Sequence, residues 1–154
     1  MRKLRKRYKK PRRPWDSGRI EEEKKITREF GLRRKREIWT AEAVVRKFRR
    51  RARNLIAVKD EEKTKILLDR LVKLGLLEKG QGLENVLALN AKDVLNRRLQ
   101  TIVFKKGFAD TLGHARQKIT HGHVSLGEKR VIFPSYIVPV EEEKIINVKG
   151  VKKG

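Results

Sequence analysis

The stretch from residue 97 to residue 138 constrains the fold of this chain more than any other. Apolar side chains recur at helical spacing before Gly107 and again before Gly122, and each glycine suits the left-handed residue that ends a helix. Val124 and Leu126 then alternate with polar residues ahead of a Gly-Glu turn, as in a short β-hairpin. This order predicts two short helices followed by a small antiparallel sheet.

The limits of these elements follow from capping residues. Asn90 and Asp93 have the spacing of a capping box, and we expect one helix from there to Gly107. Asp110 or Thr111 caps the next helix. Its expected buried side consists of Leu112, Ala115 and Ile119. A last strand is expected at Ile145, Ile146 and Val148.

The chain carries a large excess of positive charge. Among its 154 residues, 42 are Lys or Arg and 19 are Asp or Glu, so the net charge is +23. Residues 1–53 hold 23 of these cations and 7 of the acidic residues, which makes the front third the most basic part. Self-repulsion on this scale destabilises a compact state unless a polyanion neutralises it, and nucleic acid is the first candidate.

Other classes of function fit the sequence less well. No apolar run approaches the roughly 20 residues that span a bilayer, and no apolar segment follows the basic N-terminus as in a signal peptide, so we expect no membrane partner. The lack of cysteine excludes thiolate metal sites and fits a cytoplasmic protein. His121 and His123 flank one glycine without further convincing ligands, and no phosphate loop, nucleophile motif or carboxylate pair occurs. We expect no enzyme, metal, cofactor or homo-oligomer.

The chain begins with a basic extension, residues 1–18. Its first 14 residues bury too little apolar surface to fold alone. The extension is either a solubility tail or an arm that orders on RNA, and Tyr8 and Trp15 either stack on bases or pack on protein. A short helix is expected from Arg19 to Phe30, with Gly31 as its terminator.

A second helix carries many cations beside a regular apolar stripe. The stripe recurs at intervals of three and four residues and consists of Ile38, Ala41, Val45, Phe48, Ala52 and Leu55. Between its members stand Arg46, Lys47, Arg49, Arg50, Arg51 and Arg53. These cations repel one another with no acidic residue expected to offset them, and a phosphate backbone would remove that repulsion. We therefore favour an RNA-facing surface over a merely solvated one.

A third helix completes the helical part. Asp60 caps this helix and Gly75 ends it. Its apolar stripe, expected in the core, consists of Ile66, Leu67, Leu71 and Leu74. Residues 78–84 form a loop that marks a boundary. We divide the chain into an extension (1–18), a helical RNA-binding region (19–90), a second domain (91–148) and a tail (149–154).

The ordered motifs of the second half resemble a known RNA-binding module. They are Arg98-Leu99, Gly107-Phe108-Ala109, Ala115-Arg116, Gly122-His123-Val124, Gly127 and Pro134-Ser135-Tyr136. This set is similar to the S4 RNA-binding domain, or α-L module, which also occurs in some pseudouridine synthases and tyrosyl-tRNA synthetases. Upstream, the runs from Phe30 to Trp39 and from Leu87 to Gln100 resemble the archaeal and eukaryotic form of the ribosomal protein S4 family.

The resemblance implies an α+β fold, in which a mainly helical region precedes a small α-L domain. It implies a structural constituent of the small ribosomal subunit that binds the 5′ domain of small-subunit ribosomal RNA at a helix junction early in assembly. It also implies a place near the mRNA entry site, with neighbouring ribosomal proteins, protein five among them, as partners. The alternative is the docking module of an RNA-modifying or ribosome-rescue protein, but residues 1–90 are too short and too basic for a catalytic domain.

The candidate RNA-binding residues come from the charge pattern and from this resemblance. In the front part they are Arg2, Lys3, Arg5, Lys6, Arg7, Arg33, Arg34, Lys35, Arg36, Arg46, Lys47, Arg49, Arg50, Arg51 and Arg53. In the second part they are Arg97, Arg98, Lys105, Lys106, Arg116, Gln117, Lys118, His121, His123, Lys129 and Arg130. Two positions depart from the family: Gln100 stands where many members have Asp, and Leu126-Gly127 where many bacterial members have Asn-Gly.

Overall fold

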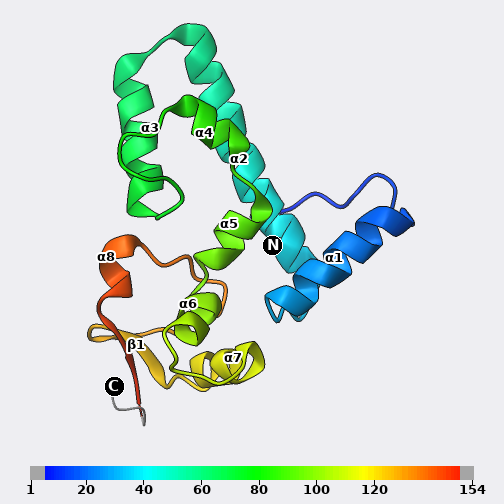
Figure 1. Cartoon of the computed structure of the whole chain (residues 1–154), viewed down its shortest axis with the longest axis vertical. Helices are drawn as coiled ribbons and strands as arrows, with labels where there is room; N and C mark the ends of the chain where they lie inside the picture. The colour runs from blue at the N-terminus through cyan, green and yellow to red at the C-terminus, as the bar shows by residue number, and fades with distance from the viewer. Residues whose placement is uncertain (1–5, 150–154) are drawn as a thin grey trace, which may run out of the picture.

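The computed structural model describes residues 6–149, and its fold class is α+β, as predicted (Figure 1). The first part contains α1 (Ser17–Glu29), α2 (Arg36–Val58), α3 (Glu61–Lys73), α4 (Leu83–Ala88) and α5 (Ala91–Asn96). The second part contains α6 (Leu99–Lys105), α7 (Leu112–Thr120), β1 (Val124–Leu126), β2 (Lys129–Arg130), α8 (Val140–Glu143) and β3 (Ile146–Val148). The pair of α2 and α3 lies at one end of the long axis, and α7 with the strands lies at the other (Figure 1).

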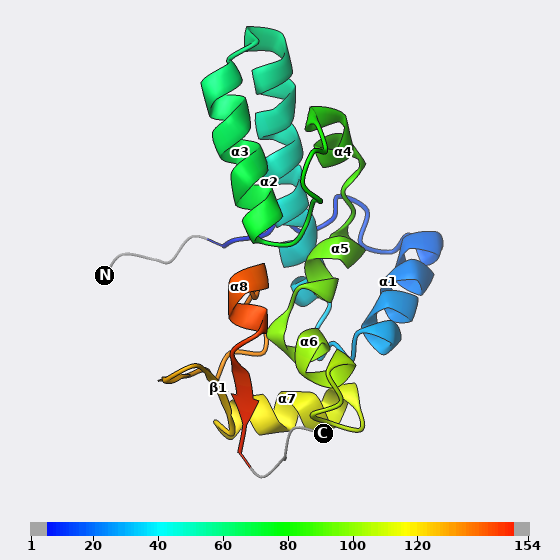
Figure 2. The same ribbon diagram turned by 60° about the vertical axis from the view of Figure 1, so that its left-hand side comes forward.

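Helices α2 and α3 form an antiparallel hairpin (Figure 2). The chain turns at Lys59, which adopts a left-handed conformation with φ 55°. Asp60 then caps α3, because its Oδ1 accepts a hydrogen bond from the Lys63 amide at 3.0 Å. The predicted stripe of α2 is buried from Ile38 to Ala52, so the long helix forms one wall of a core.

The predicted stripe of α3 needs one correction. Leu67 and Leu71 are buried and Leu74 is half-buried, but the side chain of Ile66 is 68% exposed. The buried side of α3 is narrow, and Ile66 is rotated about 100° around the helix axis from Leu67. Ile66 therefore faces solvent and is not part of the core.

The first core is closed by α4 and α5, which pack against α2. Its buried side chains are those of Phe30, Leu32, Ile38, Ala41, Val45, Phe48, Ala52, Leu67, Leu71, Leu76, Leu77, Val86, Leu89, Val94 and Leu95. Each buried leucine, isoleucine or phenylalanine contributes about 2 kcal/mol relative to an exposed one. This core makes α2 a fixed support for the side chains on its outer side.

The single helix predicted between residues 90 and 107 is wrong. The capping box itself is present, since the Asn90 amide donates to Asp93 Oδ2 at 2.7 Å. However, the backbone becomes extended at Arg98, with φ −72° and ψ 143°, and this residue separates α5 from α6. The predicted helix is two helices with a break between them.

A pairing that is distant in sequence explains this break. Arg98 forms an isolated antiparallel bridge with Ile137. Beside it, the Leu99 amide donates to the carbonyl oxygen of Tyr136 at 2.8 Å. Backbone groups that would have continued the helix are satisfied by this segment instead. Local apolar spacing carries no information about such a partner.

The second core lies between α6, α7 and a three-stranded sheet. The strand order is β2-β1-β3, and β1 pairs antiparallel with both neighbours, which confirms the predicted hairpin and the last strand except for Ile145, which precedes β3 and is exposed. Thr111, rather than Asp110, caps α7 by accepting from the His114 amide at 3.1 Å. The buried side chains are those of Leu99, Ile102, Val103, Ala109, Ala115, Ile119, Val124, Leu126, Val138, Ile146 and Val148.

Hydrophobic packing divides the described chain at the α5–α6 break. The first core ends with Leu95 and the second begins with Leu99. The division of the chain into residues 19–90 and 91–148 stays a prediction.

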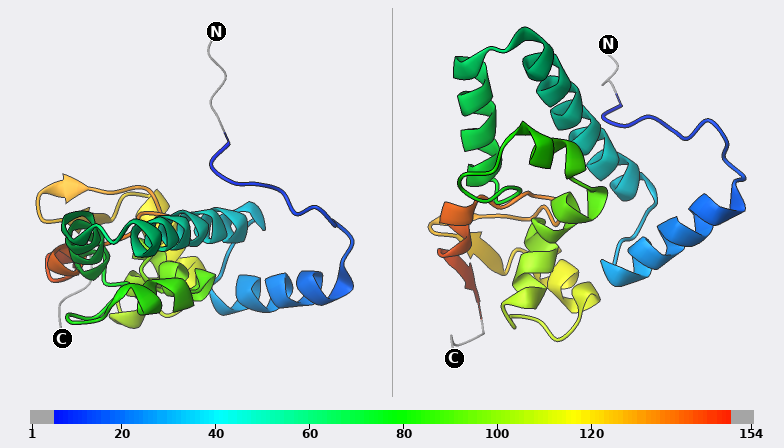
Figure 3. Two further views of the ribbon diagram at one scale, coloured as in Figure 1. Left: turned by 90° about the horizontal axis from the view of Figure 1, so that it is seen from above. Right: turned by 45° about the horizontal axis from the view of Figure 1, so that its top comes forward.

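Helix α1 extends to one side of the molecule, and the segment before it returns toward α2 (Figure 3). Asp16 caps α1 by accepting from the Arg19 amide at 3.4 Å. The ring of Tyr8 lies 5.7 Å from that of Trp39, between centroids, so Tyr8 packs on protein. Trp15, in contrast, is 89% exposed.

Candidate nucleic-acid interface

The outer side of α2 presents a row of exposed cations, which we call the α2 basic face. It consists of Arg36, Arg46, Lys47, Arg50, Arg51 and Arg53. Glu42 lies at helical spacing from Arg46 and pairs with it at 3.7 Å, so the expectation that no acidic residue offsets these cations is wrong at this one position. Within residues 6–149, the other side chains of the face from Lys47 onward have no hydrogen bond or ion pair. Their charge is available to a ligand.

Arg49 belongs to the same run but has a different role. Its side chain is half-buried, and its Nη2 donates to the carbonyl oxygen of Leu89 and, at 3.5 Å, to Asn90 Oδ1. The Leu89 carbonyl is at the end of α4, where helical acceptors lack a backbone donor. Arg49 therefore fastens α4 to α2 and contributes less to the outer surface than its neighbours.

The turn between α1 and α2 adds a second group of cations. Arg33, Arg34 and Arg36 are exposed and line a hollow of about 420 Å³ together with Tyr8 and Arg116. The hollow also contains residues of α5 and of the 134–137 segment, so both cores contribute to it. Basic side chains from distant parts of the sequence thus meet at one place.

Lys35 stands in the same turn but pairs inward. Glu23 of α1 is 4% exposed and accepts from Arg19 at 3.1 Å, from the Trp39 indole at 2.9 Å and from Lys35 at 3.3 Å. This buried carboxylate attaches α1 to the start of α2. Lys35 therefore holds two helices together.

Glu37 links the two cores. Its carboxylate lies 2.6 Å from Arg98 Nη2 and 3.4 Å from Arg116 Nη1. Burial alone would raise the pKa of Glu37, but the hydrogen bond and charge of Arg98, followed by the charge of Arg116, lower it below its ordinary value. Glu37 is thus a charged anchor at neutral pH.

Gln100 strengthens the same junction. Its buried amide donates to the carbonyl oxygens of Gly31 at 3.1 Å and Leu112 at 3.0 Å. Gly31 has φ +57°, and a Cβ there would lie 2.7 Å from Leu112 Cβ. The residue that departs from the family pattern therefore contacts both parts of the molecule.

Two predicted RNA-binding arginines are structural in the folded chain. Arg98 is 5% exposed and forms an ion pair with Glu37, so little of its side chain is available to RNA. Arg97 donates from Nη1 to Glu143 and from Nη2 to the Val138 carbonyl oxygen, each at 2.8 Å. We remove both from the candidate surface, because an arginine in a sequence motif serves packing as readily as binding.

Three lysines around the second core, of which Lys105 and Lys106 are exposed and Lys118 is half-buried, also donate to protein oxygens. Lys105 donates to Asn96 Oδ1 at 3.0 Å, Lys106 to the Glu143 carbonyl oxygen, and Lys118 to the Phe108 carbonyl oxygen at 2.8 Å. An ammonium group has three donors, so each keeps capacity for a phosphate. These lysines both stabilise the domain and add to its surface charge.

The remaining candidates lie around α7 and the hairpin. Gln117, His121, His123, Lys129 and Arg130 are exposed. Arg116 is half-buried, because its guanidinium reaches Glu37. We call the exposed set, with Lys105, Lys106 and Lys118, the S4 basic face. It lies on a different element from the α2 basic face, so two surfaces are available.

The extension contributes Lys6 and Arg7, both exposed. The predicted contacts Arg2, Lys3 and Arg5 lie outside the described residues.

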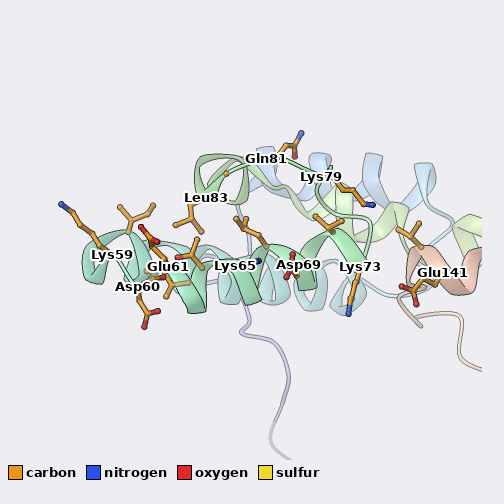
Figure 4. Close-up of a pocket in the computed structure, with 18 residues that line it drawn as sticks. Lys59, Asp60, Glu61, Lys65, Asp69, Lys73, Lys79, Gln81, Leu83 and Glu141 are labelled. Atoms are coloured by element: carbon orange, nitrogen blue, oxygen red, sulfur yellow. Dashed lines mark hydrogen bonds between the residues drawn. The ribbon is translucent and has the colours of Figure 1, made fainter.

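A hollow beside α3 differs from these basic surfaces (Figure 4). It measures about 1180 Å³ and lies between α2, α3, the 79–83 loop and α8. Its charged lining residues balance, with four lysines against four acidic residues: Lys59, Lys65, Lys73, Lys79, Asp60, Glu61, Asp69 and Glu141. A polyanion gains no net attraction there.

The described residues lack the features of two other kinds of site. Among residues 6–149, no three His, Asp or Glu side chains gather in a way that would hold a metal ion. No helix in this part of the chain is long and apolar enough to cross a membrane.

Glu23, Glu37 and Gln100 were missed by sequence reasoning. The sequence did contain a feature that could have identified Glu37, because it is the one acidic residue directly after four consecutive cations. Such a carboxylate is surrounded by possible partners and is a candidate anchor. No sequence feature identified Gln100 beyond its departure from the family pattern.

Two packed cores, each with exposed cations and joined by a buried ion pair, define the class of small basic nucleic-acid-binding proteins. Comparison with known families gives a more specific assignment. The chain matches the ribosomal protein S4/S9 N-terminal domain over residues 2–96 and the S4 domain over residues 97–144.

Full-length relatives agree with these matches. The small ribosomal subunit protein uS4 of Ignicoccus hospitalis is 48% identical, over 94% of this chain and 89% of the relative. Those of Saccharolobus solfataricus and Methanothermobacter thermautotrophicus are each 46% identical over 94% of this chain, and cover 82% and 86% of the relative. The chain therefore belongs to the uS4 family of ribosomal proteins. The relatives are structural proteins, which confirms the prediction that this chain is not an enzyme.

Proposed function

We propose that this chain is a structural constituent of the small ribosomal subunit that binds small-subunit ribosomal RNA through the α2 basic face and the S4 basic face together. One observation carries the proposal: the cations of α2 from Lys47 to Arg53, Arg49 apart, have no acceptor within residues 6–149, on a helix whose other side is fixed in a core. Repulsion along such a face is relieved by a polyanion.

Recognition rests on shape and backbone more than on base edges. Arginine and lysine contact phosphates without regard to sequence, and double-stranded RNA offers side chains little access to its deep groove. The Glu37–Arg98 pair supports this mode, because it holds the two faces in one orientation that only a suitably folded RNA can match.

The finer placement follows from the resemblance. We propose binding at a helix junction of the 5′ domain early in assembly, and a position near the mRNA entry site in the cytoplasmic ribosome. We also propose protein neighbours, with protein five among them. The alternative of a docking module gains no support, since the relatives cover nearly the whole chain and are named as ribosomal proteins.

Two measurements test this proposal. The chain should co-sediment with small ribosomal subunits after a moderate-salt wash. Its affinity for a small-subunit RNA fragment should fall by about a thousandfold between 50 and 200 mM salt, as expected for six or more phosphate contacts. Migration away from the subunits, or an affinity nearly independent of salt, would refute the proposal.

A further inference from the structure

All three histidines of the chain line one hollow in the second domain. From this we infer that the hollow is a phosphate-binding site whose affinity rises as the pH falls. The inference rests on the proposed function, because the phosphate group we assign to it belongs to the RNA backbone.

The hollow measures about 320 Å³ and is built from three elements. Helix α7 supplies His114, Gln117 and Lys118, the turn after it supplies His121 and His123, and Lys149 follows directly after β3. The rings of His121 and His123 lie nearly parallel, with an interplanar angle of 11° and centroids 6.3 Å apart. Imidazole and ammonium groups thus line the same hollow.

The charged groups around the hollow favour an anion. No carboxylate lines it. One lining histidine does contact an acidic residue outside the hollow: Asp110 Oδ2 lies 3.2 Å from His114 Nδ1. Within the described residues, no carboxylate pairs with His121 or His123. When these two rings gain protons, their charge remains available.

Arg130 of β2 adds a further cation at the edge. Its Nη2 donates to the His121 carbonyl oxygen at 2.9 Å, and its guanidinium lies over Gly122. A Cβ at Gly122 would clash with that guanidinium, and the φ of +74° is also unfavourable for other residues. Glycine at this position therefore permits Arg130 to close over the turn that carries both histidines.

The chemistry of imidazole gives the site its pH dependence. Histidine is the side chain that ordinarily changes charge between pH 5 and 8, and its protonated ring has two donors. An RNA phosphodiester remains a monoanion over that whole range. A proton gained by a ring at the hollow therefore favours a bound phosphate, and all three histidines of the chain lie there.

The test measures RNA affinity at pH 6.0 and 8.0 over a range of salt concentrations. For the unaltered chain, we expect binding about tenfold tighter at pH 6.0, and a log–log salt slope steeper by about one, since one further phosphate is neutralised. The double variant His121→Gln with His123→Gln should lose both differences, so that its affinity and its salt slope are the same at pH 6.0 and 8.0. Arg50→Gln is the matched control, because it should weaken binding by a similar factor at both pH values.

The outcomes separate the two proposals. If the chain fails to bind RNA at either pH, the proposed function fails. If binding depends on salt but the tenfold pH difference is absent, or persists in the double variant, only the histidine site is overturned. A second measurement follows the ring-proton NMR signals of the histidines during titration with inorganic phosphate. Saturation at millimolar phosphate in 0.1 M salt would keep the phosphate site but assign it to the free anion rather than to RNA.

Discussion

The first and second cores of this protein both have cationic side chains around them but use them differently. On α2, the side chains of Lys47, Arg50, Arg51 and Arg53 project outward without an acceptor among residues 6–149. In the second domain, most cations donate to protein oxygens. Positive charge counted in a sequence is therefore not equivalent to charge available for a ligand.

The lengths of the elements explain the difference. Helix α2 has 23 residues and satisfies most of its backbone internally, whereas α6 has 7, α8 has 4 and the strands have 2 or 3 each. Short elements leave many end carbonyls without a backbone donor. Lys106, Lys118 and Arg130 supply those donors. In a small domain of short elements, part of the cationic side chains is therefore used to stabilise the fold.

The largest expected effect tests whether the two cores are independent. Ala115 is 0% exposed, so Ala115→Asp places a carboxylate in the second core and should destabilise it by about 4 kcal/mol. Amide NMR signals of α6, α7 and the sheet should broaden or disappear, while those of α2 and α3 persist. Gln117→Asp, at an exposed position of the same helix, is the control. Loss of all signals together would show one cooperative unit.

A second variant tests whether the free cations of α2 bind RNA. Arg50→Glu with Arg53→Glu should lower RNA affinity by about a hundredfold and reduce the salt slope by about two, with an unchanged circular dichroism spectrum. Arg49 is left unchanged because it holds the end of α4. Lys65→Glu with Lys73→Glu makes the same change in net charge in the charge-balanced hollow, and should weaken binding only severalfold. Equal losses would mean that net charge, not the α2 basic face, decides affinity.

A third variant tests the link between the cores. Glu37→Gln leaves Arg98 buried without a countercharge and should lower the free energy of unfolding by about 2–3 kcal/mol at pH 7. Because the folded-state pKa of Glu37 is lowered, its contribution is full above the ordinary glutamate pKa of about 4.3 and is lost as the pH falls through the folded-state pKa. Urea unfolding at several pH values should show that the free energies of unfolding of the unaltered chain and of the Glu37→Gln variant become equal in acid. A constant difference down to pH 2 would contradict this assignment.

The smallest expected effect concerns the second domain alone. The hydrogen bond that the Tyr136 hydroxyl donates to Glu142 at 2.7 Å, followed by burial, raises the pKa of Tyr136 to about 12. The stability gained is present below the ordinary tyrosine pKa of about 10 and is lost as the pH rises through the folded-state pKa. In a Tyr8→Phe background, absorbance reports Tyr136 alone. Glu142→Gln should lower the pH midpoint of the Tyr136 titration. An unchanged midpoint would exclude the hydrogen bond between Tyr136 and Glu142.

Local rules recovered most elements of this fold from the sequence. The stripe of α2, the cap at Asp60, the Asn90 capping box and the hairpin were all predicted from spacing and residue type. These features are determined by neighbours within about four residues. The family resemblance added the identity of the second domain.

The features that were missed depend on distant partners. Glu37 and Arg98 are 61 residues apart, and Glu37 and Arg116 are 79 apart. The break between α5 and α6 depends on Ile137. Neither a helical period nor a charge count reveals such pairs, so the sequence indicated which residues were basic but not which of them point inward.

The Glu37–Arg98 pair has a practical consequence for engineering. The second domain cannot be transplanted as a cassette that starts at residue 97, because a fusion cut at that point would carry a guanidinium whose carboxylate stayed behind. A graft onto another host would need either an acidic residue supplied at the seam or an apolar replacement for Arg98. The second domain resembles an independent module in the sequence, but in this chain its ion pair is completed by Glu37 of α2.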